Sequence, residues 1–249
     1  MPGLGEGVRR LLDIVYPQRC VVCQRAGAVV CAGCLNSMHP LDPPACERCG
    51  ATITDASLPS SSLCADCAAG RGPMHLEGVR IAAAYTDAAR TAVLALKFHG
   101  QQRVAERLAT LMLAPFQCDI RSADMVIPVP LHSNRQRERG YNQAEALARA
   151  FARLQGLPVR ADVLVRTRAT EAQTRLSSEE RRRNVAGAFA LASPATTSVV
   201  KERRILLVDD VMTTGSTLDA AAEPLRAAGA ASVWGLAFAR PALDTSDNQ

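Results

Sequence analysis

Two adjacent carboxylates, Asp209 and Asp210, stand just before hydroxyl side chains and a glycine in the stretch 205–217, ILLVDDVMTTGST. The four apolar residues before them do not alternate with polar ones, which predicts a strand buried on both faces of a parallel sheet. Such a strand delivers the following residues to the carboxyl edge of the sheet, where open α/β folds bind ligands. The hydroxyls, the backbone N–H groups and a helix expected from Ser216 can cradle a phosphate. Because carboxylates repel phosphate, we expect Asp209 and Asp210 to face sugar hydroxyls, which predicts a ribose 5-phosphate ligand.

Arginine dominates the positive charge of the chain. The segment 131–184 holds 12 Arg against 6 Asp or Glu, whereas the whole chain has a formal net charge of +5 and two lysines, Lys97 and Lys201. Guanidinium groups suit bidentate recognition of phosphate, although clusters of them also mark nucleic-acid surfaces or plain solvated faces. We interpret the segment as a polyphosphate site in preference to a solvated face.

Eight of the nine cysteines form four C-x-x-C pairs, which are Cys20/Cys23, Cys31/Cys34, Cys46/Cys49 and Cys64/Cys67. Each pair supplies half of a tetrahedral zinc site, so the four pairs predict two structural Cys₄ zinc sites. Disulfides are less favoured, because a chain without a secretion signal is expected in a reducing compartment. Redox use of the C-x-x-C pairs is a separate alternative that we also favour less than zinc. We favour pairing along the sequence and leave a cross-brace arrangement open. Closed Cys₄ sites predict a structural or partner-binding role.

The sequence divides into four predicted parts. They are an amphipathic helix at 1–19, the double zinc ribbon at 20–68, an α/β domain at 75–240 and a disordered tail at 241–249. Alternating strands and helices in the third part predict a parallel sheet. The expected strands are 79–85, 125–129, 163–165, 205–208, 232–239 and an edge strand at 188–191; the expected helices are 87–100, 102–113, 141–154, a short one after Ser177, and 216–229, with a loop at 193–201. No stretch approaches about 18 apolar residues, so we expect no membrane span and a cytoplasmic location.

Several segments can meet at the carboxyl edge of this sheet. They are the stretch 205–217, the loop 128–143 with Arg135, Arg137 and Arg139, and the polar run 166–184, which is long enough for a mobile lid. Lys97 either reaches the site from its helix or extends its ammonium to solvent. Tyr141 and Asn142 suit packing and capping as well as they suit a site. His99 and His132 lack a neighbouring metal-ligand partner, and Cys118 is expected to be a small buried hydrophobe.

The stretch VDDVMTTGST resembles the phosphoribosyl-diphosphate signature of type I phosphoribosyltransferases. Together with the four C-x-x-C pairs, LKFHG and VIPVPLHSNRQRERGYNQ, it makes the chain similar to the ComF family from about residue 11 to residue 240. The resemblance implies an α/β fold, in which a parallel-sheet type I phosphoribosyltransferase-like domain follows a small double zinc-ribbon domain.

The resemblance also implies roles for individual residues. Asp209 and Asp210, the catalytic candidates, would hydrogen-bond the ribose 2- and 3-hydroxyls, and the segment 166–183 would take the place of the flexible loop that covers the active site. The residues implied for phosphate binding are Arg135, Arg139 and Lys97 for the diphosphate, and Thr213, Thr214, Gly215, Ser216 and Thr217 for the 5-phosphate. Mg²⁺ would be carried by the diphosphate more than by the protein.

Two classes of function follow. One is a Mg²⁺-dependent phosphoribosyltransferase that binds phosphoribosyl diphosphate and acts on an acceptor that the sequence does not identify. Displacement at the anomeric carbon needs positioning and charge stabilisation, not a nucleophilic side chain. The alternative is a non-catalytic protein of competence (DNA uptake) that binds ribose phosphate or nucleotide and acts through single-stranded DNA or a helicase-type partner. Direct contact with single strands is disfavoured, because stacking uses aromatic side chains and the basic segment offers only Tyr141 and Phe151.

Overall fold

The computed structural model describes residues 18–40, 45–53, 62–98, 102–117, 120–169 and 178–241. The predicted amino-terminal helix and the predicted tail lie outside these residues or at their edge, and His99 and Cys118 lie outside them.

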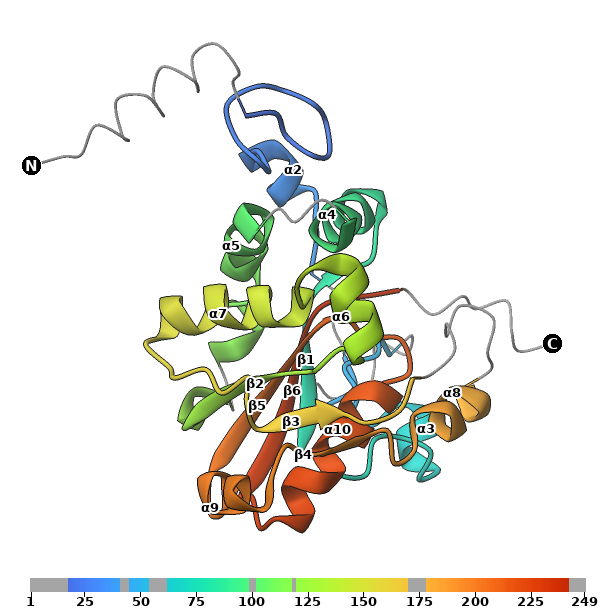
Figure 1. The fold of residues 1–249 in the computed structure, drawn as a ribbon. Helices are drawn as coiled ribbons and strands as arrows, with labels where there is room; N and C mark the ends of the chain where they lie inside the picture. Colours follow the sequence, from blue (N-terminus) through green and yellow to red (C-terminus); the bar gives the residue numbers. More distant parts are fainter. Residues whose placement is uncertain are drawn as a thin grey trace, which may run out of the picture.

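A parallel sheet with the strand order β1-β6-β5-β2 forms the centre of the molecule (Figure 1). Within the described residues its strands are β1 (Gly78–Ala84), β2 (Met125–Pro128), β5 (Arg204–Val211) and β6 (Ser232–Arg240). Leu206 of β5 stands opposite Val126 of β2 on one side and Trp234 of β6 on the other. The predicted parallel sheet is therefore confirmed, and the strand that opens the stretch 205–217 lies in its interior.

Both faces of this sheet are buried, because successive side chains of a strand point to opposite sides. Leu206 and Val208 join a core with α4, α5 and α7, whereas Ile205 and Leu207 join a second core with α10. The helices in the described residues are α2 (Ala32–Asn36), α3 (Ala65–Ala68), α4 (Asp87–Phe98), α5 (Gln102–Leu111), α6 (Ser133–Arg139), α7 (Gln143–Gln155), α8 (Ser178–Val185), α9 (Thr197–Val200) and α10 (Ser216–Ala227), with 3-10 turns at Pro115–Gln117, Ile120–Ser122 and Pro194–Thr196.

The two cysteine-rich segments pack on opposite faces of the sheet. Val30 and Leu35, from the first segment, belong to the core on the α5 side, and α2 lies beside α5 (Figure 1). Cys46, Cys49 and Cys67, from the second segment, belong to the core that contains α10. The sheet thus separates the two segments.

Two segments differ from the sequence prediction. Residues 188–191 were expected at an edge of the main sheet, but β4 (Phe189–Leu191) pairs antiparallel with β3 (Leu164–Arg166) in a separate two-stranded sheet. A strand of three residues carries too little pattern to reveal its partner. Residues 193–201 were expected as a loop, but they form a 3-10 turn and α9, which is anchored by the buried Val200.

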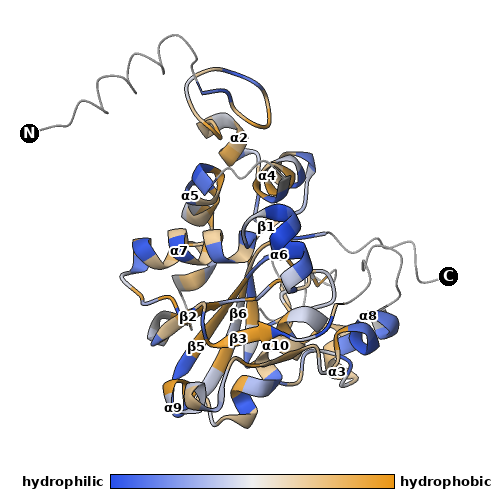
Figure 2. Cartoon of the chain, in the orientation of Figure 1, coloured by the Kyte–Doolittle hydropathy of each residue, from blue (hydrophilic) through white to orange (hydrophobic). Residues whose placement is uncertain are grey.

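The loop expected at 128–143 contains a two-turn helix, α6. It buries none of its residues and is hydrophilic on every side, as Figure 2 shows. Without an apolar stripe it has no periodicity that a sequence could reveal. Its ends are nevertheless well defined, because the His132 ring accepts a hydrogen bond from the Asn134 N–H and Gly140 ends the helix at φ 77°. His132 is therefore a helix cap.

Candidate functional site

Asp209 and Asp210 lie at the carboxyl end of β5, at the edge toward which all four parallel strands run. Asp210 is buried, with 4% of its surface exposed, and Asp209 is half-buried. The backbone N–H of Asp210 donates to Oδ1 of Asp209 over 2.8 Å. Neighbouring side chains of a strand start toward opposite faces, but these two carboxyl groups remain close enough for each to act on the pKa of the other.

Lys97 of α4 meets Asp210 on the sheet face that α4 covers. Its Nζ lies 2.7 Å from Oδ2 of Asp210, and the two side chains are 22% and 6% exposed. Removal of either partner would leave the other charge buried and unpaired, at a cost of about 3–5 kcal/mol. The structure therefore places the Lys97 ammonium on a carboxylate, and its contact with a diphosphate stays a prediction.

The Lys97–Asp210 pair separates the protonation behaviour of the two acids. Burial disfavours both charges of the pair, but their mutual attraction outweighs it, so the pKa of Lys97 is raised and that of Asp210 is lowered. Burial and the adjacent Asp210 charge raise the pKa of Asp209 well above its usual value. Pairs of acids whose environments separate their pKa values in this way are typical of functional sites. The contact with Lys97 thus favours the charged form of Asp210, whereas no cation among the described residues forms such an ion pair with Asp209.

The loop after β5 leads directly into the amino-terminal end of α10. Gly215 occupies the N-cap position with φ 83°, a left-handed conformation that favours glycine. The hydroxyls of Thr214 and Ser216 lie 2.7 Å apart, and the backbone N–H of Asp219 donates to the Gly215 carbonyl. The predicted anion cradle is thus made of first-turn N–H groups and hydroxyls, and its binding of a phosphate stays a prediction.

The diphosphate candidates Arg135 and Arg139 both lie on α6 and are half-buried. A guanidinium N–H of Arg139 donates to Oε1 of Gln143 over 3.1 Å, which ties α6 to the start of α7. Arg137 is exposed and bonds Asn134 within α6 instead. The helix therefore turns two of its three arginines inward.

Arg166 reaches the same region, although the sequence marked it only as the first residue of the polar run. Its guanidinium lies over the Phe189 ring, 5.2 Å from the ring centroid, and its backbone bridges to His132. Burial and the charge of Arg135 lower the pKa of Arg166, whereas the charge of Asp209 raises it. Arg166 therefore stands among the groups of the site, at the base of the predicted lid.

The predicted lid lies partly outside the described residues, which stop at 169 and resume at 178. The two ends of this segment are held together, because the Arg168 guanidinium donates to the carbonyls of Asn184 (3.0 Å) and Ala186 (2.8 Å). The first and last residues of the predicted lid, near Arg166 and Asn184, therefore lie close together.

Tyr141 and Asn142 have different roles. Asn142 caps α7: it accepts from the Ala144 N–H and donates to the Val129 carbonyl, each over 3.0 Å. Tyr141 packs against the α7-side core, and its hydroxyl is buried without a hydrogen-bond partner among the described residues. Burial raises the pKa of Tyr141, and the Arg139 and Asp210 charges act on it in opposite directions. The Tyr141 hydroxyl thus lies near the site as a donor.

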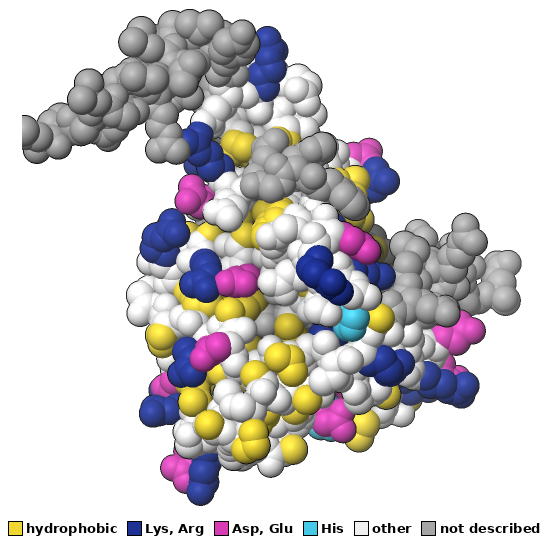
Figure 3. All heavy atoms as spheres, viewed as in Figure 1, with side chains coloured by type: hydrophobic (Ala, Val, Ile, Leu, Met, Phe, Trp, Pro, Cys, Tyr) yellow, Lys and Arg dark blue, Asp and Glu magenta, His cyan; other side chains and the backbone are white. Residues whose placement is uncertain are grey.

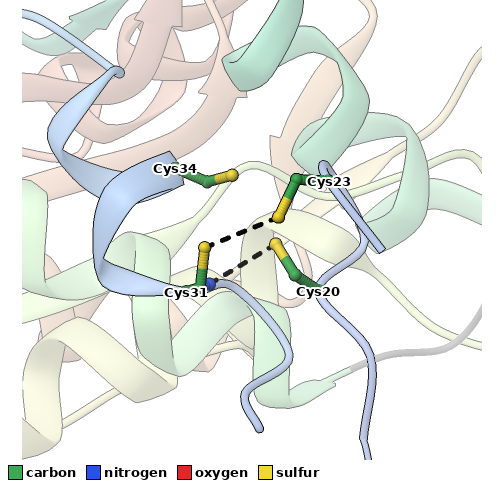
Figure 4. A group of neighbouring side chains, drawn as sticks. All are labelled: Cys20, Cys23, Cys31 and Cys34. Carbon is green, nitrogen blue, oxygen red and sulfur yellow. Dashed lines mark hydrogen bonds between the residues drawn. The ribbon is translucent and has the colours of Figure 1, made fainter. Parts of the chain in front are cut away.

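The cysteines form two groups whose possible ligand atoms lie within 4.8 Å of one another, and these groups are Cys20, Cys23, Cys31 and Cys34, and Cys46, Cys49, Cys64 and Cys67. The sulfurs of the first group point toward one centre (Figure 4). Cys23 and Cys31 have sulfurs 3.7 Å apart, as do Cys49 and Cys64. Sulfurs that share a tetrahedral zinc are about 3.8 Å apart. Both groups fit zinc, and the pairing follows the sequence.

Each cysteine group also favours a thiolate within it. Burial opposes ionisation of Cys20, but backbone N–H groups of Cys23 and Cys31 lower its pKa to about 6. Cys49 lowers the pKa of Cys46 to about 4, and burial raises that of Cys67 to about 12. A complete set of thiolates therefore requires a cation to offset its charge, which is how metal binding couples to folding.

Two known protein families match separate parts of the chain. A double zinc ribbon domain family matches residues 11–68, and a phosphoribosyl transferase domain family matches residues 137–242. The chain is a phosphoribosyltransferase-like protein with a double zinc ribbon. The exact limits of its domains stay a prediction.

The particular family follows from relatives that match most of the chain. Competence protein F of Haemophilus influenzae is 31% identical over 232 residues, covering 89% of this chain and 97% of the relative. DNA utilization protein YhgH of Escherichia coli O157:H7 is 31% identical over 229 residues, covering 88% and 96%. Competence protein ComFC of Bacillus subtilis is 27% identical and covers 81% and 80%. The chain belongs to the ComF family.

Among solved structures, a glutamine phosphoribosylpyrophosphate amidotransferase from B. subtilis complexed with ADP and GMP is 25% identical, with a TM-score of 0.35. The match covers 53% of this chain and about a quarter of that chain (26%).

None of the helices in the described residues combines the length and the apolar character needed to cross a bilayer.

Proposed function

We propose that this protein binds phosphoribosyl diphosphate with Mg²⁺ and transfers the phosphoribosyl group to or from an acceptor. The observation that carries the proposal is the arrangement at the end of β5. A half-buried carboxyl, Asp209, directly precedes an anion cradle at the start of α10, while Lys97 neutralises the second carboxylate. A sugar diol beside a phosphate is the ligand chemistry that this arrangement recognises best.

Each group has a separate task in such a reaction. The carboxyl of Asp209 accepts hydrogen bonds from the ribose diol, and Arg135 and Arg166 face the departing diphosphate. The bond from the anomeric carbon to the diphosphate oxygen breaks as the bond to the acceptor forms, and positive charge builds on the ribose. Mg²⁺ would neutralise the diphosphate. Lys97 already holds Oδ2 of Asp210. We therefore expect Mg²⁺ to be carried by the diphosphate, and Asp209 to be the carboxylate that faces the ion.

Calorimetry with phosphoribosyl diphosphate and MgCl₂ tests the binding. The wild type should bind, and the double variant Asp209→Asn with Asp210→Asn should lose the signal. Asp162→Asn is the matched control, since it removes an exposed carboxylate that pairs only locally with Arg160. The absence of binding to folded wild-type protein would overturn the proposal.

Turnover is tested separately from binding. Purified protein is screened against nucleobases and amines for release of diphosphate from phosphoribosyl diphosphate. Release with one acceptor, lost in the double variant, establishes the enzyme. Tight binding without release under every condition leaves the ligand site but assigns it to a sensor.

The printed names of the relatives, which refer to competence and to DNA utilization, give a second candidate, a role in DNA uptake through DNA or a protein partner. Figure 3 shows basic and acidic side chains side by side on the face it presents. On α7, Arg149 pairs with Glu145, and Arg153 pairs with Glu106 of α5. Such pairing weakens direct attraction to a phosphate backbone. A gel-shift titration with single-stranded DNA, with and without phosphoribosyl diphosphate, tests the direct route.

A further inference from the structure

The segment that leaves the second cysteine cluster passes directly over the anion cradle. The cluster holds the start of this segment closely, since a Cβ at Gly72 would meet the Cys67 sulfur at 2.4 Å. The Arg71 N–H donates to the Asp66 carbonyl over 2.7 Å, and the Arg71 guanidinium pairs with the Asp66 carboxylate. We term residues 70–75 the strap. The second cluster therefore positions the start of the strap.

Asp219, in the first turn of α10, binds the other end of the strap. Its Oδ1 accepts the backbone N–H groups of Met74 (2.8 Å) and His75 (2.7 Å). Its Oδ2 lies 3.4 Å from Nδ1 of the His75 ring. Three groups from one short segment thus converge on a single carboxylate.

Between these two ends the strap touches the cradle itself. A Cβ at Gly215 would lie 3.3 Å from Cγ of Pro73 and 2.6 Å from Cε of Met212. The N-cap of α10 is therefore enclosed between the strap and the loop that follows β5. A cavity of about 210 Å³ remains alongside, lined by the strap, α8 and α10, including Thr214 and Ser216.

The charge of Asp219 is otherwise hard to reconcile with an anion site. A carboxylate in the first turn of a helix competes with any phosphate for the same N–H groups and repels it. Here the carboxylate is occupied by the N–H groups of the strap. The position makes sense if its task is to hold the strap against the cradle.

We propose that Asp219 is a positioning residue that fastens the strap over the cradle, so that metal occupancy of the second cysteine cluster and affinity for the ribose 5-phosphate are linked. The linkage rests on the proposed function, because it takes the cradle to be the 5-phosphate site. Linkage is reciprocal: ligand binding should protect the second cluster as much as the intact cluster improves binding. The first cluster, on the other face of the sheet, should not respond.

The test compares variants that separate the hydrogen bonding of Asp219 to the strap from the negative charge of its carboxylate. Asp219→Ala removes the acceptor of the strap, and we expect affinity for phosphoribosyl diphosphate with Mg²⁺ to fall by about 10-fold or more, within the usual range of coupling energies. Asp219→Asn keeps an acceptor oxygen and should bind within about 3-fold of wild type. Glu223→Ala, one turn further along α10 and beside the same cavity, is the control and should change little. Loss of charge alone predicts the opposite sign, a gain in affinity for Asp219→Ala.

A second readout is the labelling rate of the cysteines, and its comparison of wild type with Asp219→Ala needs no ligand. Cysteine alkylation, followed by peptide mass spectrometry, should show faster labelling of Cys64 and Cys67 in Asp219→Ala and unchanged labelling of Cys31 and Cys34. In wild type, saturating phosphoribosyl diphosphate should slow labelling of Cys64 and Cys67 only. If wild type fails to bind this ligand, the proposed function is overturned, while the Asp219→Ala labelling still tests the strap. Unchanged or tighter binding by Asp219→Ala, or unchanged labelling of the second cluster, would overturn the linkage.

Discussion

The two cysteine clusters have the same ligand chemistry but different surroundings. In the second cluster Cys46, Cys49 and Cys67 are buried, whereas in the first only Cys20 is buried and Cys23 is exposed. The second cluster belongs to the core formed with α10, and the first packs near α5. A metal-binding motif therefore fixes the local fold of each ribbon, but the surrounding core decides whether the rest of the protein depends on it.

The contacts around each cluster show the same difference. In the second ribbon, the buried Arg240 donates to the Cys49 carbonyl over 2.5 Å, and a Cβ at Gly78 would meet the Glu47 carbonyl at 2.7 Å. In the first ribbon, the part-buried Arg107 donates to the Val30 carbonyl over 3.3 Å. Backbone carbonyls of the second ribbon thus lie against β1 and β6. The chain that leaves the first ribbon reaches β1 through a backbone bond from the Ala84 N–H to the His39 carbonyl over 2.9 Å.

Disabling each cluster should give the largest effect. Cys46→Ser with Cys49→Ser should remove one zinc and lower the free energy of unfolding of the whole chain by several kcal/mol, because metal binding and core packing are lost together. Cys20→Ser with Cys23→Ser should also remove one zinc but should cost the α/β domain at most about 1–2 kcal/mol. Metal analysis and chemical denaturation measure both.

The single tryptophan offers a check if the variant Cys46→Ser with Cys49→Ser does not fold. Trp234 contacts the Gly78 position beside the Glu47 carbonyl of the second ribbon, and it also packs against the core that the first ribbon joins. The Arg80 guanidinium lies 4.8 Å from its ring centroid. Graded removal of zinc from wild type by a chelator should change Trp234 fluorescence as the second zinc leaves. A change that follows the loss of the first zinc instead would contradict the comparison.

Two arginines provide a matched pair of contacts. Arg240→Ala leaves the Cys49 carbonyl buried and unpaired and empties packing space, so we expect a loss of about 2–3 kcal/mol in the free energy of unfolding. Arg107→Ala removes a longer, less buried bond and should cost about 1 kcal/mol or less. Urea unfolding of the two variants measures both values. Equal losses would show that the two ribbons are joined to the domain equally strongly.

Two glycines provide a smaller contrast. Gly215→Ala places a methyl group against Met212 and Pro73 at a positive φ, and we expect a loss of about 1–2 kcal/mol, together with weaker binding of phosphoribosyl diphosphate. Gly33→Ala, in α2 of the first ribbon, meets nothing within 4 Å and should be neutral or stabilise slightly. Thermal unfolding and calorimetry check both. A harmless Gly215→Ala would mean that the strap and the cradle are loosely packed.

A partly exposed ion pair at the opposite end of β5 provides a reference for how much a surface charge pair contributes to the free energy of unfolding. Arg204 donates to Asp124 from its guanidinium and its backbone N–H, and these bonds hold the pKa of Asp124 at about 2. The unfolded value is about 3.9, so the folded chain gains stability above that pH and loses it as the pH falls toward 2. Because the pair is partly exposed, Asp124→Asn should cost about 1 kcal/mol at pH 7. The difference from wild type should vanish near pH 2 in acid unfolding; a difference that persists there would contradict the assignment.

Much of the site could be predicted from local pattern. The apolar run before Asp209, the hydroxyls and the glycine before Ser216 specify strand, loop and helix within one continuous stretch, and the structure has these elements in that order. Asn142 could be foreseen as a cap for the same reason, because caps depend on neighbouring residues. By contrast, α6 is polar throughout, and β4 is too short to select a partner.

Local residue types and spacing were enough to predict the two cysteine groups and the position of the two acids after a buried strand, and the alternation of strands with helices was enough to predict the parallel sheet. Only the folded chain shows that Lys97 pairs with Asp210, that Arg166 joins the site, and that the two ribbons join cores on opposite faces of the sheet. These arrangements join residues far apart in the chain. Their energies come from burial and from charges brought together by the fold, and no local pattern encodes either.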